Sequence, residues 1–285
     1  MNESFEKIIL EFELGCPNNR CDWWDRPGDL TVIQKNEKGE DVAIEILRFM
    51  TPYRVAGKWQ VDVTHLRPIL AGNVKFQVYI RTYVSRGHAN GDGWLASARF
   101  LLKRGTPAIA AKAVIPIWNK QMIFYGDPKD PSNRAKQVKL PNIPFQKMLL
   151  ATVITGHGQG NLSNCAEFCP KTHTMKVNDT ELTKLFWRDD CNKNPINNQM
   201  GTWMFSRAGW CPGDIVKPWV EEVLAPQTDD ATVTVTYEPE PYVNTCRPGA
   251  EECDGCTLGA NCTKYNGQNH TPPHFFMSSV LILAD

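Results

Sequence analysis

The stretch from Val74 to Val84, with the sequence VKFQVYIRTYV, alternates between two kinds of side chain at every second residue. The apolar set contains Val74, Phe76, Val78 and Ile80, and the polar and aromatic set contains Lys75, Gln77, Tyr79, Arg81 and Tyr83. A period of two is the spacing at which side chains reach opposite faces of a β-strand. We therefore expect a strand with one face packed in a core and one polar and aromatic face.

Similar strand-sized apolar segments lie on both sides of this stretch and are bounded by Gly, Pro, Asn or Asp. They are residues 7–14, 30–34, 42–50, 59–63, 95–103 and 108–118 in the first half, and residues 147–155, 232–237 and 275–283 in the second. The first half contains no stretch that keeps a 3.6-residue period. Residues 180–187 are read as a short helix. The sequence therefore predicts an all-β fold.

The length and two prolines predict two domains. A chain of 285 residues is long for one domain and comfortable for two. The prolines of the segment LPNIP, residues 140–144, interrupt the strand pattern. We expect an N-terminal β-sandwich domain over residues 1–141 and a C-terminal one over residues 145–285, with a Cys-rich loop at residues 245–262.

Composition excludes some classes of partner and indicates a compartment. Lys+Arg and Asp+Glu balance at 31 each, so the charge favours neither nucleic acid nor an anionic membrane surface. No apolar run approaches the roughly 20 residues that span a bilayer. Ten cysteines suit a secreted, periplasmic or other oxidising compartment. The segment MNES opens no signal peptide, so we expect that the leader is absent from this chain.

Residues 16–26, CPNNRCDWWDR, combine a potential cystine ring with aromatic and charged side chains. A disulfide between two cysteines five positions apart would make the Pro-Asn-Asn turn almost rigid. The turn would then present Asp25 and Arg26 beside aromatic faces, which suits a polar ligand with apolar faces, such as a sugar. The simpler alternative is a stapled surface turn with a salt-bridged Asp-Arg pair.

A second dense stretch, NCAEFC at residues 164–169, places Glu167 inside a Cys-x₃-Cys pair. A carboxylate held in a small ring has little conformational freedom, which suits a general acid, a base or a group that orients water. The alternative is that Glu167 only bonds backbone amides of its own loop. A metal site of Cys165, Cys169 and His173 is disfavoured, because an oxidising compartment favours a disulfide and no fourth ligand is evident.

Amide, indole and guanidinium side chains gather in residues 194–213. Amides and arginine hydrogen-bond sugar hydroxyls and acetamido groups, and indole faces stack on sugar rings. Core packing of Trp203 and Trp210 is the alternative to sugar binding.

Four further cysteines, at positions 246, 253, 256 and 262, are expected to form two local disulfides, with a zinc knuckle as the alternative. His270 and His274 are separated by two prolines, so we read them as loop residues rather than metal ligands. We expect no metal and no other cofactor.

Three of these stretches together resemble the peptide-N-glycosidase F family. The resemblance rests on the Cys-Pro-Asn turn, second Cys and Trp-Asp-Arg of residues 16–26, on Cys-Ala-Glu-x-Cys and Thr-His-Thr in residues 165–174, and on residues 194–199 (NPINNQ) and 207–213 (RAGWCPG). Weaker matches are Thr51-Pro52-Tyr53, Asp62-Val63-Thr64 and Gly72-Asn73. The matches follow one another in order along nearly the whole chain, except in the Cys-rich loop.

The resemblance implies a fold and a reaction. The fold would be two side-by-side, jelly-roll-like antiparallel β-sandwiches with the active site in the cleft between them. The reaction would be hydrolysis of the amide bond between asparagine and the first N-acetylglucosamine of an N-glycan, which gives aspartate and a glycosylamine. The partners would be N-glycosylated proteins or glycopeptides, and we expect a monomer.

The matching motifs also imply roles for single residues. Asp25 would be the primary catalytic carboxylate and Glu167 the second. The substrate would be bound by Trp24, Arg26, Arg81, His157, Arg207 and Trp210. The implied disulfides are Cys16–Cys21, Cys165–Cys169 and Cys191–Cys211.

Two positions depart from the family pattern. Arg81 stands where the family's prototype has a third acid in the cleft, and His157 stands where the family has an aromatic residue. These changes leave three hypotheses: an active amidase with a remodelled cleft, a glycan-binding protein on a decayed enzyme scaffold, or a cell-surface adhesion module. We favour the amidase, because Asp25, Arg26, Glu167, Arg207 and Trp210 are all retained.

Overall fold

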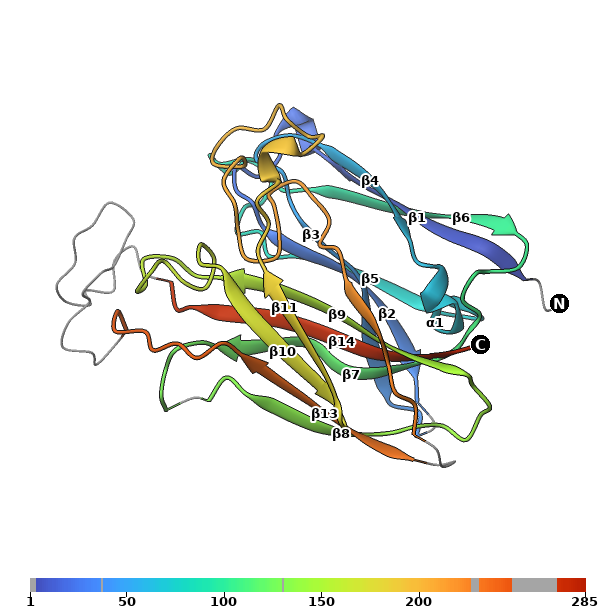
Figure 1. Ribbon diagram of the computed structural model, residues 1–285. Coiled ribbons are helices and arrows are strands. Elements are labelled where there is room, and N and C mark those ends of the chain that lie inside the picture. The colour runs from blue at the N-terminus through green and yellow to red at the C-terminus, as the bar shows by residue number, and fades with distance from the viewer. Residues whose placement is uncertain (1–3, 37, 130, 227–230, 248–270) are drawn as a thin grey trace.

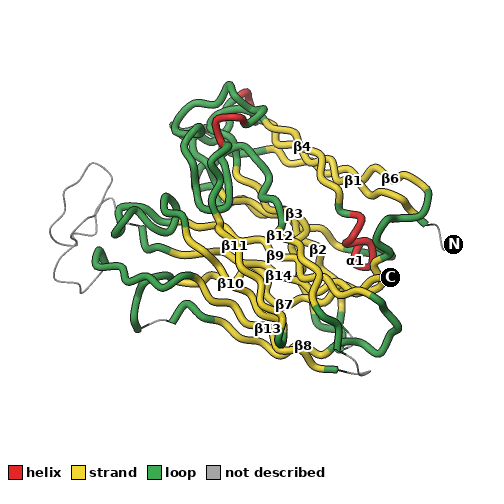
Figure 2. Tube along the Cα trace, in the orientation of Figure 1, coloured by secondary structure: helices red, strands yellow, loops and turns green. Residues whose placement is uncertain are grey.

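The structure is a computed structural model that describes residues 4–36, 38–129, 131–226, 231–247 and 271–285. Within these ranges the chain is almost entirely β, as predicted, and its helical segments are short (Figure 2). None of the helices in the described part is long and apolar enough to cross a membrane. The helical segments are η1 (Pro17–Asn19), η2 (Thr64–Leu66), α1 (Arg67–Leu70) and η3 (Cys191–Lys193).

The first sandwich is formed by two three-stranded antiparallel sheets, with strand orders β4-β1-β6 and β3-β2-β5 (Figure 1). Its strands are β1 (Phe5–Gly15), β2 (Pro27–Lys35), β3 (Asp41–Met50), β4 (Gly57–Asp62), β5 (Lys75–Ile80) and β6 (Leu95–Arg104). Every second residue of β1, from Ile8 to Leu14, is buried in the core that the two sheets share. This alternation is the reason that the segment folds as a half-buried strand.

One side of the first sandwich is open. On β5 the apolar set lies on the side of the core, because Val78 pairs with the core residue Leu30, but it is not packed there as predicted. Phe76 and Val78 remain 40% and 39% exposed. The reason is that β5 and β6 are both edge strands, and the rings of Phe76 and Phe100 meet across the gap at a centroid distance of 5.2 Å.

The second sandwich contains the sheets β12-β9-β14-β7 and β11-β10-β13-β8. Its strands are β7 (Ala111–Phe124), β8 (Arg134–Lys139), β9 (Lys147–His157), β10 (Lys171–Val177), β11 (Thr180–Phe186), β12 (Trp219–Val223), β13 (Thr232–Pro239) and β14 (His274–Ala284). Figure 1 shows the four sheets of the molecule lying in succession, with β9, β14 and β7 between the first sandwich and the remaining sheet.

The central strand β14 is buried on both faces. Its odd-numbered residues Phe275, Met277 and Leu281 join the core of the second sandwich. Its even-numbered residues Val280 and Ile282 join the core of the first sandwich. Burial on both faces explains why the segment is largely apolar, apart from the buried Ser278 and Ser279. The two sandwiches therefore share an apolar interface that fixes the edges of the cleft described below.

Two predictions about elements differ from the structure: β11 stands where a helix was expected, and His274 is the first residue of β14 rather than a loop residue. Residues 180–187 form β11 rather than a helix, since they pair with β10 across a tight turn in which Asn178 has φ 48°. The chain enters the second sandwich before the expected domain boundary at residues 141–145. Strand β7 already pairs with β14, and β8 pairs with β13. The prolines at residues 141 and 144 thus interrupt strands within the second sandwich. Where the chain divides into folding units stays a prediction.

Candidate active site

A small disulfide ring and a buried acid hold the loop that carries Asp25. Cys16 and Cys21 are bonded, as predicted. Asp22 follows the ring and is fully buried. Its carboxylate accepts hydrogen bonds from the Trp24 N–H (3.1 Å), from Arg26 Nε (3.1 Å) and from the Thr82 hydroxyl (2.7 Å). The acid that the loop buries is therefore Asp22, which leaves Asp25 free to face the cleft.

Thr51, at the end of β3, braces the peptide groups on both sides of Asp25. Its hydroxyl donates to the Trp24 carbonyl (2.9 Å) and accepts from the Arg26 N–H (2.7 Å). The Thr51 N–H donates in turn to the Arg26 carbonyl at 2.9 Å. These bonds fix the backbone of Asp25 against the first sandwich.

Glu167 lies in the second predicted ring, which the Cys165–Cys169 disulfide closes. Its N–H donates to the Gly158 carbonyl (3.2 Å), and its carbonyl accepts from the Ala208 N–H (2.9 Å). Gly156 lets this loop approach β9, because a Cβ there would lie 2.5 Å from the Ala166 carbonyl oxygen. The loop is thereby attached both to the end of β9 and to the segment that carries Arg207.

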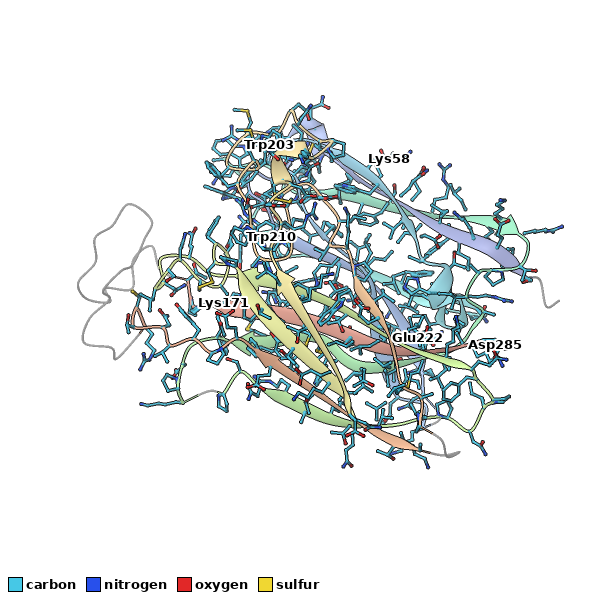
Figure 3. All side chains as sticks on the ribbon, in the orientation of Figure 1. Lys58, Lys171, Trp203, Trp210, Glu222 and Asp285 are labelled. Atoms are coloured by element: carbon cyan, nitrogen blue, oxygen red, sulfur yellow. A yellow bond between two sulfur atoms is a disulfide. The ribbon has the colours of Figure 1, made fainter. Side chains whose placement is uncertain are left out.

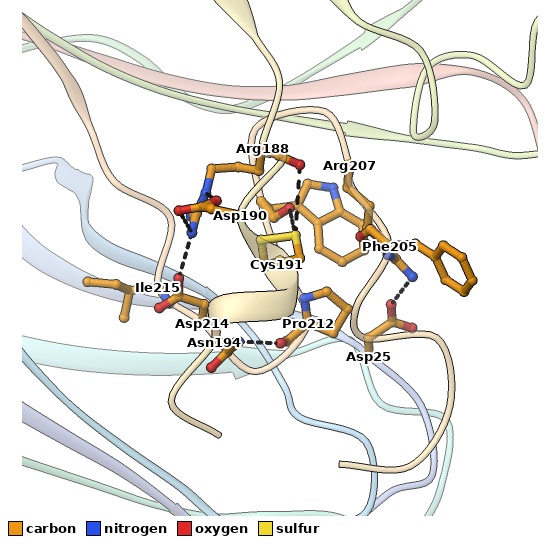
Figure 4. The surroundings of a disulfide bond; sticks show 12 residues. Asp25, Arg188, Asp190, Cys191, Asn194, Phe205, Arg207, Pro212, Asp214 and Ile215 are labelled. Atoms are coloured by element: carbon orange, nitrogen blue, oxygen red, sulfur yellow. Dashed lines mark hydrogen bonds and ion pairs between the residues drawn. A yellow bond between two sulfur atoms is a disulfide. The ribbon is translucent and has the colours of Figure 1, made fainter. Parts of the chain in front are cut away.

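Arg207 joins the two carboxylates. Its Nη2 lies 3.7 Å from Asp25 Oδ2 (Figure 4). Its Nε lies 3.3 Å from Glu167 Oε1. The side chain is only 1% exposed. Nη1 donates to the Phe205 carbonyl (2.7 Å) and Nη2 to the Thr202 hydroxyl (3.0 Å). The third disulfide, Cys191–Cys211, anchors the segment behind it. The structure thus brings together the acid pair and the arginine that the sequence predicted.

Burial raises the pKa of both carboxyls. The pKa of Asp25 is raised because its carboxylate loses water, although the charges of Arg207 and Arg26 favour ionisation. The pKa of Glu167 is raised to about 8, first by the same loss of water and then by the charge of Asp25, with Arg207 opposing the shift. Two carboxyls that share one arginine therefore favour a state with a single negative charge.

The acid pair opens into a cavity of about 470 Å³ between the sandwiches. Of the predicted site residues, the cavity is lined by Trp24, Asp25, Arg26, Arg81, His157, Glu167 and Arg207. Its lining also includes Tyr53, Tyr83, Phe168, Thr202, His274 and Phe276. The indole of Trp24 is 50% exposed, and the guanidinium of Arg26 lies 4.9 Å from the ring centroid of Tyr83. Aromatic faces and charged groups thus alternate around the opening.

Trp210 does not line the cavity. It is 2% exposed, and its indole N–H donates to the Gly156 carbonyl at 2.8 Å (Figure 3). Its ring stacks on His157 at 5.5 Å between centroids and lies 5.0 Å below the guanidinium of Arg207. Core packing, the alternative considered for this tryptophan, describes its place. Trp210 supports the floor of the cleft from beneath.

The metal alternative at the Glu167 loop is wrong. Cys165 and Cys169 are bonded to each other, and His173 is buried with its Nδ1 2.8 Å from the Tyr237 hydroxyl. Across the described ranges, no group of three or more His, Cys, Asp or Glu side chains is placed to hold a metal ion. Cys253, Cys256, Cys262 and His270 lie outside the described residues, so the pairing or metal binding of that cluster stays a prediction. The three disulfides indicate an oxidising compartment.

Sequence reasoning missed several residues that complete the site. Tyr53 is the main one: its hydroxyl lies 3.1 Å from the Thr202 hydroxyl, and burial together with the charge of Asp25 raises its pKa. The motif Thr51-Pro52-Tyr53 was its only signal. Phe276 and His274 lie on β14, far along the chain from the motifs, and no local pattern identified them.

Comparison with known proteins identifies the family. The family described as "Peptide-N-glycosidase F, C terminal" matches residues 125–282, and "Peptide-N-glycosidase F, N terminal" matches residues 34–91. The chain is 33% identical over 255 residues to peptide-N(4)-(N-acetyl-beta-D-glucosaminyl)asparagine amidase F of Elizabethkingia miricola, a match that covers 84% of this chain and 68% of that protein.

Comparison with solved structures leads to the same family. A crystal structure of peptide-N(4)-(N-acetyl-beta-D-glucosaminyl) asparagine amidase superposes with a TM-score of 0.78 at 28% identity, covering 99% of this chain and 86% of that one. A structure of PNGase F from Flavobacterium meningosepticum gives 0.76 at 27% identity, covering 99% and 85%. PNGF-II shares the fold, with a TM-score of 0.69 at 17% identity, covering 99% and 57%. By its sequence matches and its fold, this chain belongs to the peptide-N-glycosidase F family.

Proposed function

We propose that this protein hydrolyses the amide bond between asparagine and the first N-acetylglucosamine of N-glycosylated proteins or glycopeptides. The observation that supports this most directly is the buried arrangement of Asp25, Arg207 and Glu167 at the base of the cavity. The 33% identical relative is named for this amidase activity. The tryptophan, tyrosine and arginine side chains at the opening suit a glycan, because aromatic faces stack on sugar rings.

The site residues supply the two proton functions that amide hydrolysis requires. Water must lose a proton to attack the amide carbon, and the leaving nitrogen must gain one. Asp25 is proposed to orient and deprotonate the water, since Arg207 and Arg26 favour its ionised form. Glu167, with its pKa of about 8, is proposed to hold a proton at neutral pH and to donate it to the leaving nitrogen as the C–N bond breaks. Acid–base help of this kind accelerates a reaction roughly 10²–10⁴-fold.

The decisive experiment is release of N-glycan from a denatured glycoprotein. We expect release by the wild-type protein and a loss of about a hundredfold or more in Asp25→Asn, which keeps the size of the side chain and removes its basic oxygen. Undiminished release in Asp25→Asn would reject the catalytic assignment. If the wild-type protein binds the glycopeptide but releases no glycan, it is a glycan-binding protein on this scaffold.

The protein is proposed to act as a monomer and to be secreted or periplasmic.

A further inference from the structure

Arg81 differs from the other two arginines of the cleft in what its guanidinium contacts. Arg26 is paired with Asp22, and Arg207 is paired with Asp25 and Glu167. The guanidinium of Arg81 instead lies 3.9 Å from the ring centroid of Phe276. Among the described residues no carboxylate lies within ion-pair distance of it. Arg81 therefore brings into the cleft a positive charge that none of the described acids pairs with.

The guanidinium of Arg81 lies over the Phe276 ring and donates no hydrogen bond to a described residue, so its N–H groups are available to a ligand. A guanidinium is planar, and contact with an aromatic ring uses its face, while its N–H groups point outward from its edges. Its backbone N–H donates to the Pro27 carbonyl at 3.0 Å, which fixes where the side chain begins. The neighbouring imidazoles favour their neutral form and neither add to nor offset the charge of Arg81. The pKa values of His157 and His274 are lowered, mainly by burial and in part by Arg81.

Arg81 stands between the main cavity and a side pocket of about 160 Å³. Arg81, Phe276 and Pro27 line both spaces. Gly28 and Tyr79 form part of the wall of the side pocket. The two other cations there are already paired, Lys120 with Asp29 at 3.0 Å and Arg48 with Glu45 at 2.7 Å. Among the described residues, Arg81 is thus the one cation of the side pocket that no carboxylate pairs with.

We propose that Arg81 forms an anion-binding subsite that takes a negatively charged group of the substrate close to the scissile amide. The group is a sulfate or a carboxylate, because these match the paired N–H donors of a guanidinium. It is carried either by the glycan or by an acidic residue next to the linked asparagine. This inference rests on the proposed function and adds to it a preference for charge.

The test compares three glycopeptides of one sequence: a neutral one, one with a sulfated glycan, and one with aspartate next to the glycosylated asparagine. We expect wild type to hydrolyse at least one anionic peptide with a kcat/KM about tenfold above that of the neutral peptide, a ratio typical of a charge-assisted hydrogen bond. The arm that shows the preference identifies the source of the anion. The ratio should fall with added salt, since the cleft is open to solvent.

Arg81→Gln should bring this ratio close to one, and Arg81→Lys should give an intermediate ratio, because lysine keeps the charge but not the paired donors. Arg99→Gln is the matched control: it removes an arginine that pairs with Glu11 on β1, outside the cleft, and should keep the wild-type ratio. An unchanged ratio in Arg81→Gln, or no preference in wild type, overturns the subsite. If wild type releases no glycan from any peptide, the proposed function fails, and the ratios of Kd for the same peptides then decide on the subsite alone.

Discussion

At the scale of single residues, the protonation of Glu167 is the property with the widest consequences. Its carboxyl is 16% exposed and faces Arg207 across 3.3 Å, yet its pKa is raised to about 8 because burial and the charge of Asp25 outweigh the arginine. A carboxyl that keeps its proton at neutral pH can donate a hydrogen bond where an ionised one can only accept. The same buried pair therefore contains a donor and an acceptor.

This pKa predicts how stability depends on pH. The folded protein keeps the Glu167 proton at pH values where the unfolded chain, with a carboxyl pKa near 4.5, has lost it. The stabilising contribution of the proton is therefore complete below about pH 4.5 and is lost as pH rises through about 8. Glu167→Gln cannot ionise, so the free energy of unfolding of wild type should fall relative to that of the variant between pH 5 and pH 9. Urea unfolding at pH 5, 7 and 9 measures this, and a constant difference would contradict it.

At the scale of elements, the loop between β5 and β6 acts as a support for the Asp25 loop. The Trp23 N–H donates to the Asn90 carbonyl (3.1 Å), and the Asp92 N–H donates to the Arg20 carbonyl (2.7 Å). Gly91 makes this approach possible: its φ is +112°, and a Cβ there would lie 2.2 Å from the Cys21 carbonyl oxygen. Two loops that are distant in sequence thus form one rigid unit beneath the cleft.

Gly91→Ala is expected to separate these loops and to reduce both activity and stability. The matched control is Gly72→Ala, where φ is +75° but a Cβ meets nothing within 4 Å. The control should lose about 1–2 kcal/mol of unfolding free energy from backbone strain alone. Gly91→Ala should lose more than the control, because backbone must move, and kcat should fall with it. Urea unfolding and glycan release measure the two effects, and equal losses in the two variants would show that contact with Cys21 is unimportant.

The strands that could be predicted are those whose burial produces a simple pattern. β1 alternates because one face is buried, and β14 is largely apolar because both faces are buried. β8, β10 and β12 were missed since each is short and carries several charged or polar side chains. In β11 the spacing of Leu182 and Phe186 fits both a helix and a strand, and pairing with β10 decides for the strand.

The site residues divide in the same way, into those that a local sequence pattern indicates and those that it does not. Asp25, Glu167 and Arg207 were found because each lies in a short motif that could be recognised locally. Asp22, Thr51 and Phe276 act through contacts with residues far away in sequence, such as the bond from Thr82 to Asp22. No periodicity or spacing reports such a contact, so these residues became visible only in three dimensions.

At the scale of the whole molecule, one buried arginine connects the two sandwiches. Arg48 on β3 forms a two-point pair with Glu45, with both contacts at 2.7 Å. It also donates to the Phe276 carbonyl (2.7 Å) and to the Thr155 hydroxyl (3.2 Å) of the second sandwich. Because Phe276 carries the ring beneath Arg81, this network connects the sandwich interface to the wall of the cleft.

Arg48→Met should destabilise the protein by about 3–5 kcal/mol, because it leaves Glu45 buried and unpaired. The matched variant Arg48→Met/Glu45→Leu removes both charges and should recover much of that loss. Urea unfolding of wild type and the two variants measures both steps. If the double variant is no more stable than Arg48→Met, the loss comes from the contacts to Phe276 and Thr155 rather than from the stranded carboxylate.

The positions of the three disulfides have a practical consequence. One ring immediately precedes the Asp25 loop, one encloses Glu167 and one anchors the segment that carries Arg207. A thiol reductant therefore acts on the parts that hold the proposed catalytic groups, while the strand cores contain none of these bonds. A glycoprotein substrate can be unfolded by reducing its own disulfides before it is treated with an enzyme. We expect the same reductant to loosen the cleft of this protein as well, unless it is removed or quenched first.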